Sequence, residues 1–152
     1  MKLTPKIHQA MNLAAEKHLG QTRKGNGLPY ITHPFAVAFI LNDYTDDEDV
    51  ICAGLLHDVL EDVKGYGYAK MERDFGWKVS GIVREVSEDK NPDFKGNERL
   101  TWEKRKKEYL KHLEKASQEA LLVSAADKLH NLISMVELYG EKGDEMWLEF
   151  NA

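Results

Sequence analysis

The stretch Val50-Ile51-Cys52-Ala53-Gly54-Leu55-Leu56-His57-Asp58-Val59-Leu60 decides the fold class of this chain. Arranged as a helix it is apolar on nearly every side, which predicts a central, buried helix. Thr45-Asp46-Asp47 supplies a capping signal before it, and we expect the helix to run to about Glu61. His57 and Asp58 are the exceptions within this apolar stretch. Because burying an unpaired carboxylate costs several kcal/mol, Asp58 must find a cation or several hydrogen-bond donors.

Helical patterns extend in both directions from this stretch. Thr4-Pro5 begins a first helix that ends near Gly20, and Pro34 begins a second that stops at the Asn42-Asp43 turn. Further helices are predicted near residues 68–75 and 77–88, from residue 101 onward, and at residues 118–139 with Gly140 as the stop. Since no segment alternates apolar and polar residues as a strand does, we expect an all-α fold in a single helical-bundle domain.

Charge and hydropathy argue against several classes of function. The net charge of −5, from 21 basic and 26 acidic residues, argues against a general binder of nucleic acid or anionic membranes. The amino terminus lacks a signal-peptide core, and no apolar run approaches the ~20 residues that span a bilayer. Cys52 is the single cysteine, so no intrachain disulfide can form and a reducing, cytoplasmic setting is favoured. We interpret Cys52 as a small core residue rather than a nucleophile.

Two other polar features stand out. In the helix predicted at residues 118–139, Asp127, Asn131 and Ser134 form a polar stripe at i, i+4 and i+7. The apolar face predicted for the same helix comprises Leu122, Ala126, Leu129, Ile133 and Val136. His33 stands just before the helix that begins at Pro34. Taken alone, the stripe suits a solvated surface, and His33 suits a cap or surface residue. The buried pair at 57 and 58 is equally compatible with a structural role and a functional one.

Together, these segments offer two imidazoles and two carboxylates from three different helices. That set suits a divalent metal with open positions for water, of the Mn²⁺ or Fe²⁺ type, better than a closed structural zinc site. Such a metal would lower the pKa of a bound water and hold a phosphate oxygen. Glu61 and Asp62 follow at i+4 from His57 and Asp58, and a carboxylate there can reach such a water as a general base.

The wider sequence resembles a known family. A His, a contiguous His-Asp and a distant Asp resemble the HD superfamily of metal-dependent phosphohydrolases. The stretches that carry a closer likeness are Gly20-Gln21-Thr22-Arg23-Lys24, Pro29-Tyr30-Ile31-Thr32-His33-Pro34, residues 53–62 and residues 126–132. They resemble the hydrolase domain of RelA/SpoT enzymes and the small alarmone hydrolases, from about Ala10 to Ser134. The resemblance implies an HD-type bundle over residues 1–152 that removes the 3′-pyrophosphate from (p)ppGpp, with metal-bound water attacking the 3′-phosphate.

Site residues follow from the resemblance position by position. The implied metal ligands are His33, His57, Asp58 and Asp127, with Mn²⁺ as the expected ion. Glu61 and Asp62 match the acidic pair that orients or deprotonates the attacking water. The implied substrate contacts are Arg23, Lys24, Asn131, Ser134, Lys90 and Arg105. For Lys90 and Arg105 the alternative is the solvated face of a charged helix. The role of His130 stays open between a packed residue and one that supports a ligand.

Two departures from the family bear on the nucleotide site. The loop from Arg23 to His33 carries Gly25-Asn26-Gly27 and is about a residue longer than in the long synthetase-hydrolases. The chain also stops at Ala152, where relatives usually continue into a further helix. We therefore expect either a shortened chain or a more open nucleotide pocket.

Two alternatives to an alarmone hydrolase remain open. One is an HD phosphohydrolase acting on another nucleotide or a phosphomonoester. The other is a nucleotide-binding regulatory domain without turnover, which the complete ligand set and acidic pair disfavour. The expected partner is a small-molecule nucleotide substrate, with no nucleic acid and no membrane. The sequence does not indicate the oligomeric state.

Overall fold

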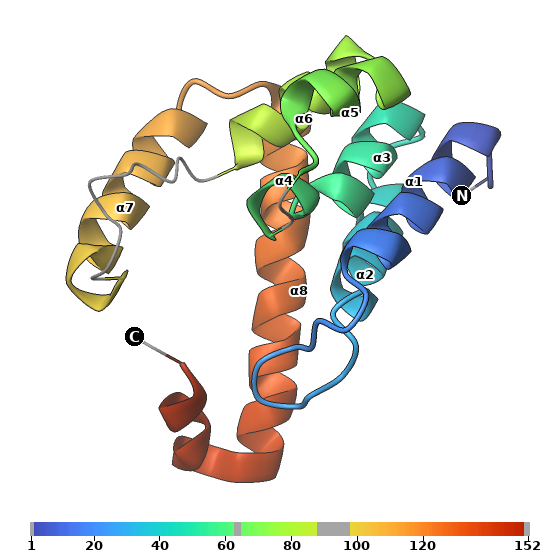
Figure 1. The fold of residues 1–152 in the computed structure, drawn as a ribbon. Helices are drawn as coiled ribbons and strands as arrows, with labels where there is room; N and C mark the ends of the chain where they lie inside the picture. The colour runs from blue at the N-terminus through green and yellow to red at the C-terminus, as the bar shows by residue number, and fades with distance from the viewer. Residues whose placement is uncertain (1, 63–64, 88–97, 151–152) are drawn as a thin grey trace.

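Helices make up the regular structure of the described residues, which are 2–62, 65–87 and 98–150 of a computed structural model (Figure 1). In chain order they are α1 (Pro5–Lys17), α2 (Thr32–Asn42), α3 (Glu48–Leu56), α4 (Val59–Asp62), α5 (Tyr68–Phe75), α6 (Trp77–Val86), α7 (Glu98–Leu113), α8 (Gln118–Lys142) and the 3₁₀ helix η2 (Gly143–Glu149). Helix α8 runs the length of the molecule, with α1 to α3 on one side of it and α7 on the other (Figure 1). The all-α prediction is confirmed. Among the described helices, none is long and apolar enough to cross a membrane.

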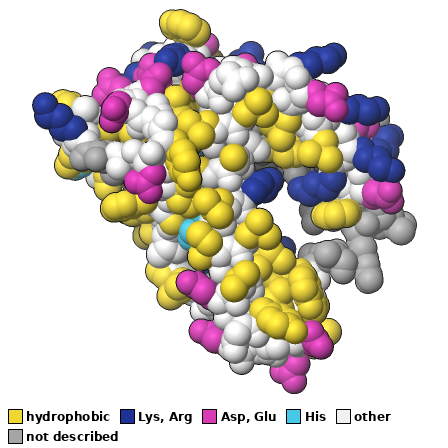
Figure 2. Space-filling view, turned by 180° about the vertical axis from the view of Figure 1, so that it is seen from behind, with side chains coloured by type: hydrophobic (Ala, Val, Ile, Leu, Met, Phe, Trp, Pro, Cys, Tyr) yellow, Lys and Arg dark blue, Asp and Glu magenta, His cyan; other side chains and the backbone are white. Residues whose placement is uncertain are grey.

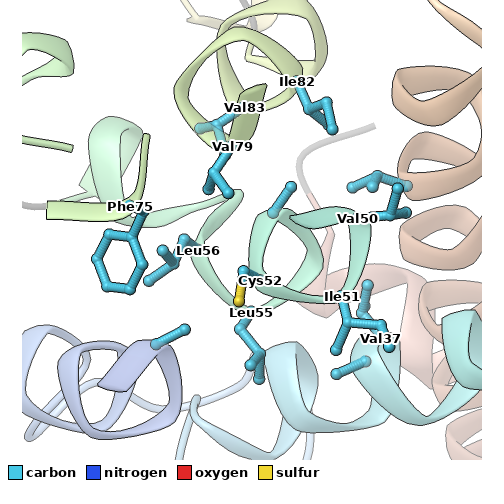
Figure 3. Close-up of a cluster of buried hydrophobic side chains, with 14 of the residues drawn as sticks. Val37, Val50, Ile51, Cys52, Leu55, Leu56, Phe75, Val79, Ile82 and Val83 are labelled. Carbon is cyan, nitrogen blue, oxygen red and sulfur yellow. The ribbon is translucent and has the colours of Figure 1, made fainter. Parts of the chain in front are cut away.

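Helix α3 lies at the centre, as its sequence predicts. Every residue from Val50 to Leu56 is buried, and α3 contacts α1, α2, α6 and α8. Figure 3 shows Cys52 within this cluster of apolar side chains, with Phe75 and Val79 contributed by α5 and α6. Cys52 is fully buried, and this burial raises the pKa of its thiol to about 12. The interpretation of Cys52 as a core residue is confirmed.

A glycine allows α2 and α3 to approach closely. A Cβ placed on Gly54 would lie 2.3 Å from Leu41 Cδ1 and 3.4 Å from Val37 Cγ1. A larger residue at position 54 would therefore have to displace the buried Leu41 side chain of α2. The close approach places the first turn of α2, with His33, beside the end of α3, with His57, and the two rings lie 5.2 Å apart.

The predicted helix through residue 61 is interrupted, and that prediction was wrong. Helix α3 ends at Leu56, and α4 begins at Val59. The His57 ring donates from Nδ1 to the Gly54 carbonyl over 2.7 Å. In a regular helix that carbonyl accepts the N–H of residue 58, so the ring bond competes with the helical one and favours the break. His57 and Asp58 thus occupy a turn.

Helix α8 differs from its prediction at its end and in its exposed face. It passes through Gly140 and ends at Lys142, and Gly143 caps it with a φ of +56°. Lys142 donates from Nζ to the Gly25 carbonyl over 2.9 Å, a tertiary contact that supports the extra turn. On the face of α8 that was predicted to be apolar, Ala126 is buried, whereas Leu129, Ile133 and Val136 are exposed. Figure 2 shows hydrophobic side chains at the surface along this face of the molecule.

Candidate functional site

Three segments bring the four predicted metal ligands together. His33 occupies the first turn of α2 and is 1% exposed, while His57 and Asp58 form the turn between α3 and α4. Asp127 lies on α8, on the stripe that faces these residues. The stripe of α8 that the sequence left open as solvated surface is therefore turned inward.

His33, His57 and Asp58 converge on one point, and Asp127 approaches the two histidines from α8. His33 Nε2 lies 3.1 Å from Asp127 Oδ1 and 3.6 Å from Asp58 Oδ2. His57 Nε2 lies 3.0 Å from Asp58 Oδ2 and 3.8 Å from Asp127 Oδ1. Two ligands held at about 2.1 Å from one ion lie roughly 3 to 4 Å apart, so these separations fit a shared cation. The potential ligand atoms of His33, His57 and Asp58 all lie within 4.8 Å of one another.

An unsatisfied nitrogen supports the same conclusion. His57 Nε2 is buried and forms no hydrogen bond of good geometry with the described residues, although a carboxylate oxygen is near. A buried polar atom in this condition costs free energy unless it has another partner. A divalent cation at the point where His57, His33 and Asp58 converge would supply one, so the donor set fits a metal.

The surrounding groups keep both carboxylates ionised. Burial raises the pKa of Asp58, but the charge of His57 and the hydrogen bond from Tyr30 outweigh it and hold that pKa well below its usual range. Tyr30 donates to Asp58 Oδ2 over 2.6 Å. Burial also raises the pKa of Asp127, and His33, His57 and Lys128 outweigh it, so this pKa is lowered too. Both aspartates are thus ready to bind a cation at neutral pH.

The histidines of the cluster differ in the direction in which their pKa values are shifted. Burial lowers the pKa of His57, but the charges of Asp58 and Asp127 outweigh it and raise that pKa to about 9. The pKa of His33 is lowered, chiefly by burial, with Asp127 opposing. Burial, His33 and Arg23 lower the pKa of His130 to about 4. His33 and His130 are therefore neutral near pH 7.

A second group of predicted residues lines one hollow beside this cluster. The hollow has a volume of about 440 Å³ and is lined by Thr22, Arg23, Lys24, Asn26, Tyr30, Asn131, Ser134, Met135, Leu138 and Phe150. Arg23 Nη2 donates to Asn131 Oδ1 over 3.0 Å and lies 3.4 Å from Ser134 Oγ. Asn131 Nδ2 donates to Asp127 Oδ1 over 2.7 Å. One amide therefore connects the arginine of the hollow to the metal cluster.

Local backbone bonds hold the loop that carries Arg23 and Lys24. Thr22 and Pro29 form an isolated antiparallel bridge, and Arg23 N–H donates to the Leu28 carbonyl over 2.8 Å. Gly25 has φ +89°, in the left-handed region that favours glycine. This closed loop places Arg23 over the Tyr30 ring, 5.8 Å from its centroid.

The remaining predicted residues lie elsewhere or outside the described structure. Arg105 lines a different hollow of about 490 Å³, together with Arg84 and Tyr109. Tyr109 also borders a small hollow against His57, Asp58 and Asp127, so the two hollows share this residue. Lys90 lies outside the described residues. Glu61 and Asp62 end α4, but their side chains are also outside what the structure describes.

Two hydrogen bonds beside the cluster were not predicted from the sequence. Tyr30 had no assigned role, although it stands three residues before His33 and its hydroxyl reaches Asp58. Ser124 stands three residues before Asp127, and its hydroxyl lies 3.0 Å from the Tyr109 hydroxyl at the edge of the small hollow beside the cluster. In both cases a spacing of three residues from a ligand was the available signal.

Comparisons with known proteins agree with this geometry. A family model described as HD domain matches residues 10–149. The guanosine-3′,5′-bis(diphosphate) 3′-pyrophosphohydrolase MESH1 of Xenopus tropicalis is 42% identical over 129 residues, which are 83% of this chain and 67% of that protein. The bifunctional (p)ppGpp synthase/hydrolase SpoT of Escherichia coli (strain K12) is 35% identical over 137 residues, 90% of this chain and 19% of SpoT.

A solved structure extends the likeness to three dimensions. It is described as a metazoan ortholog of SpoT that hydrolyzes ppGpp, and it superposes with a TM-score of 0.77 at 33% sequence identity. The superposition covers 90% of this chain and 73% of that chain. The chain therefore belongs to the HD domain family.

Proposed function

We propose that this protein is a metal-dependent phosphohydrolase that removes the 3′-pyrophosphate from guanosine 3′,5′-bis(diphosphate). MESH1, at 42% identity, is named for this reaction. The observation that carries the proposal is the path of hydrogen bonds from Arg23 through Asn131 to Asp127. This path joins a nucleotide-sized hollow to a cluster of metal-binding groups. We further propose that residues 1–152 form one HD phosphohydrolase domain, which the family match to residues 10–149 supports.

We propose that the ion is held by His33, His57, Asp58 and Asp127. HD hydrolases use divalent metals, and the cluster of imidazole and carboxylate atoms fits one. Mn²⁺ is the proposed ion, because mixed nitrogen and carboxylate ligands with room for water suit it. When bound, such an ion lowers the pKa of water and stabilises charge on a phosphate oxygen.

The reaction requires a water in line with the bond that breaks. The water oxygen joins the phosphorus nearest the ribose 3′ oxygen, the bond from that phosphorus to the 3′ oxygen breaks, and the 3′ oxygen takes up a proton. Pyrophosphate and guanosine 5′-diphosphate are the products. From their place in the sequence, we assign Glu61 and Asp62 to orienting the water and removing its proton. Tyr30 keeps Asp58 ionised and in place through its 2.6 Å hydrogen bond.

The Arg23 hollow is the proposed site for the nucleoside. Arg23 and Lys24 supply positive charge, and an arginine can stack on a base or pair with phosphate. Leu138 and Phe150 supply apolar surface in the same hollow. Asn131 and Ser134, which contact Arg23, would orient it, and we propose that they also contact substrate.

The hollow that contains Arg105 is the proposed site for further phosphates. Arg105 and Arg84 are two arginines in its lining, and it shares Tyr109 with the small hollow beside the metal cluster. We assign Lys90 the same role from its place in the sequence. We also expect the reaction to take place in the cytoplasm. The free thiol of the buried Cys52 is compatible with the reducing conditions there.

A metal-dependent assay against several nucleotides tests the proposed function. With Mn²⁺, the protein should release pyrophosphate from guanosine 3′,5′-bis(diphosphate) and leave guanosine 5′-diphosphate, and a chelator should abolish turnover. Faster turnover of another nucleotide or a phosphomonoester would instead support a different HD phosphohydrolase. Tight nucleotide binding without turnover in any metal would support a regulatory domain.

A further inference from the structure

The hydrogen-bond partner of His33 on its outer side is a second histidine. His33 Nδ1 and His130 Nδ1 lie 2.7 Å apart, with their ring centroids 4.9 Å apart. His130 lies on α8 between Asp127 and Asn131, two residues of the proposed site, and it is half-buried. Its ring therefore packs directly against a proposed metal ligand.

The other nitrogen of His33 faces the cluster. Nε2 lies 3.1 Å from Asp127 Oδ1 and 3.6 Å from Asp58 Oδ2, so it is the atom that would bind a cation. A neutral imidazole that offers the Nε2 lone pair must carry its hydrogen on Nδ1. At 2.7 Å, that hydrogen is donated to the Nδ1 lone pair of His130. His130 must then carry its own hydrogen on Nε2.

His57 provides an internal comparison. Its Nδ1 faces the Gly54 carbonyl over 2.7 Å, and a carbonyl can only accept. The backbone therefore sets the tautomer of His57 whatever side chains surround it. For His33 the corresponding acceptor is a side chain. The orientation of His33 consequently depends on the residue at position 130, and a substitution can change it.

We propose that His130 is a positioning residue that fixes the tautomer and ring plane of His33, so that His33 presents Nε2 to the metal as a lone pair. Histidine ligands commonly donate their second N–H to a fixed acceptor, and loss of that acceptor typically costs 10–100-fold in metal affinity. This inference rests on the proposed metal site. It assigns His130 no contact with substrate.

Two substitutions separate positioning from packing. In His130→Asn, the amide oxygen occupies the place of the histidine Nδ1, so the acceptor is kept. In His130→Leu, the acceptor is lost but the helix and the apolar contact remain. His8→Leu is the control, because His8 is an exposed histidine on α1 whose ring Nε2 lies 3.4 Å from the Asn12 amide nitrogen.

The first measurement is Mn²⁺ affinity by calorimetry on chelator-treated protein. His130→Leu should weaken binding on the order of tenfold or more, while His130→Asn should stay within about threefold of the wild type. His8→Leu should bind as the wild type does. Equal Mn²⁺ affinity in wild type and His130→Leu, with equal melting temperatures, would overturn the role of His130 alone. A wild-type protein that binds no divalent ion would overturn this inference together with the metal site.

The second measurement does not depend on a variant. Long-range ¹H–¹⁵N spectra of the wild-type protein loaded with Zn²⁺, a diamagnetic probe, report which nitrogen of each histidine carries hydrogen. His33 should be protonated on Nδ1 and metal-bound through Nε2, with His130 protonated on Nε2. A His33 bound to zinc through Nδ1, or a His130 protonated on Nδ1, would overturn the proposal.

Discussion

Asn131 donates from Nδ2 to Asp127 Oδ1 over 2.7 Å, while its own carbonyl oxygen accepts from Arg23. The amide is thus oriented from both sides, and it supports the carboxylate proposed to bind the metal. Asn131→Ala should weaken Mn²⁺ binding on the order of tenfold, because a ligand loses its supporting hydrogen bond. Ser134→Ala, which loses the longer contact with Arg23 and a hydrogen bond to the His130 carbonyl of its own helix but no contact with Asp127, should leave Mn²⁺ affinity unchanged. Unchanged affinity in Asn131→Ala, measured by calorimetry, would contradict this role.

Replacement of Arg23 should distinguish nucleotide recognition from the chemistry itself. Arg23 lines the nucleotide hollow and is not one of the proposed metal ligands. A hydrogen bond to a charged group contributes about 1.5–3 kcal/mol, so Arg23→Ala should lower kcat/KM for guanosine 3′,5′-bis(diphosphate) by roughly 10–100-fold. Hydrolysis of a small phosphate ester should change little. If both substrates lose equally, the hollow is not the nucleoside site.

Asp47 should make a pH-dependent contribution to stability far from the metal site. It caps α3 by accepting from Asp49 N–H over 3.0 Å, and it pairs with Lys78. The Lys78 hydrogen bond is the main reason that the pKa of Asp47 is lowered, with burial opposing. Because the folded pKa is below the unfolded value of about 3.9, the stabilisation is present above that pH and is lost as the pH falls through the folded pKa.

Urea unfolding at two pH values checks this contribution. At pH 7, Asp47→Ala should lower the free energy of unfolding by about 1–2 kcal/mol through loss of the cap and the ion pair. Asp47→Asn keeps a capping oxygen and should lose less. Near pH 3 or below, the difference between wild type and Asp47→Asn should shrink. If the difference in unfolding free energy between wild type and Asp47→Asn grows as the pH falls, the folded structure does not stabilise the ionised Asp47 carboxylate.

Two helical glycines should respond to alanine with opposite signs. At Gly54 a new Cβ would meet Leu41 Cδ1 at 2.3 Å, and Leu41 is fully buried. Overpacking costs typically 1–3 kcal/mol, against a helix-propensity gain of about 1, so Gly54→Ala should destabilise. At Gly81 in α6 a Cβ would meet nothing within 4 Å, and Gly81→Ala should stabilise by about 0.5–1 kcal/mol. Chemical denaturation of both variants measures the signs, and stabilisation by Gly54→Ala would contradict the close packing of α2 and α3.

The fold class could be predicted because it depends on local pattern and on burial, whereas the set of four ligands was implied by the family resemblance. The apolar stretch around Cys52 predicted a central helix, and the cost of burying Asp58 predicted a partner for it. The family resemblance implied that Arg23 and Asn131 both contact substrate, and in the structure Arg23 Nη2 lies 3.0 Å from Asn131 Oδ1.

Other features depend on contacts that a one-dimensional pattern does not contain. Helix α8 has both an apolar stripe with Leu129 and Val136 and a polar stripe with Asp127, and periodicity alone does not say which faces inward. In the structure the polar stripe faces inward, because Asp127 lies against His33 and His57 while Leu129 and Val136 remain exposed. The break after Leu56 was missed for a similar reason, since it accompanies the bond from the His57 ring to the Gly54 carbonyl.

Titration with Mn²⁺ tests the central claim, that His33, His57, Asp58 and Asp127 hold a divalent ion. Chelator-treated wild-type protein should bind one ion per chain, and Asp127→Asn should lose most of that affinity because a charged ligand becomes a neutral amide. Asp144→Asn, at an exposed carboxylate on η2, is the matched control and should bind as the wild type does. Failure of the wild type to bind Mn²⁺ or any similar ion, or equal binding by Asp127→Asn, would contradict the account.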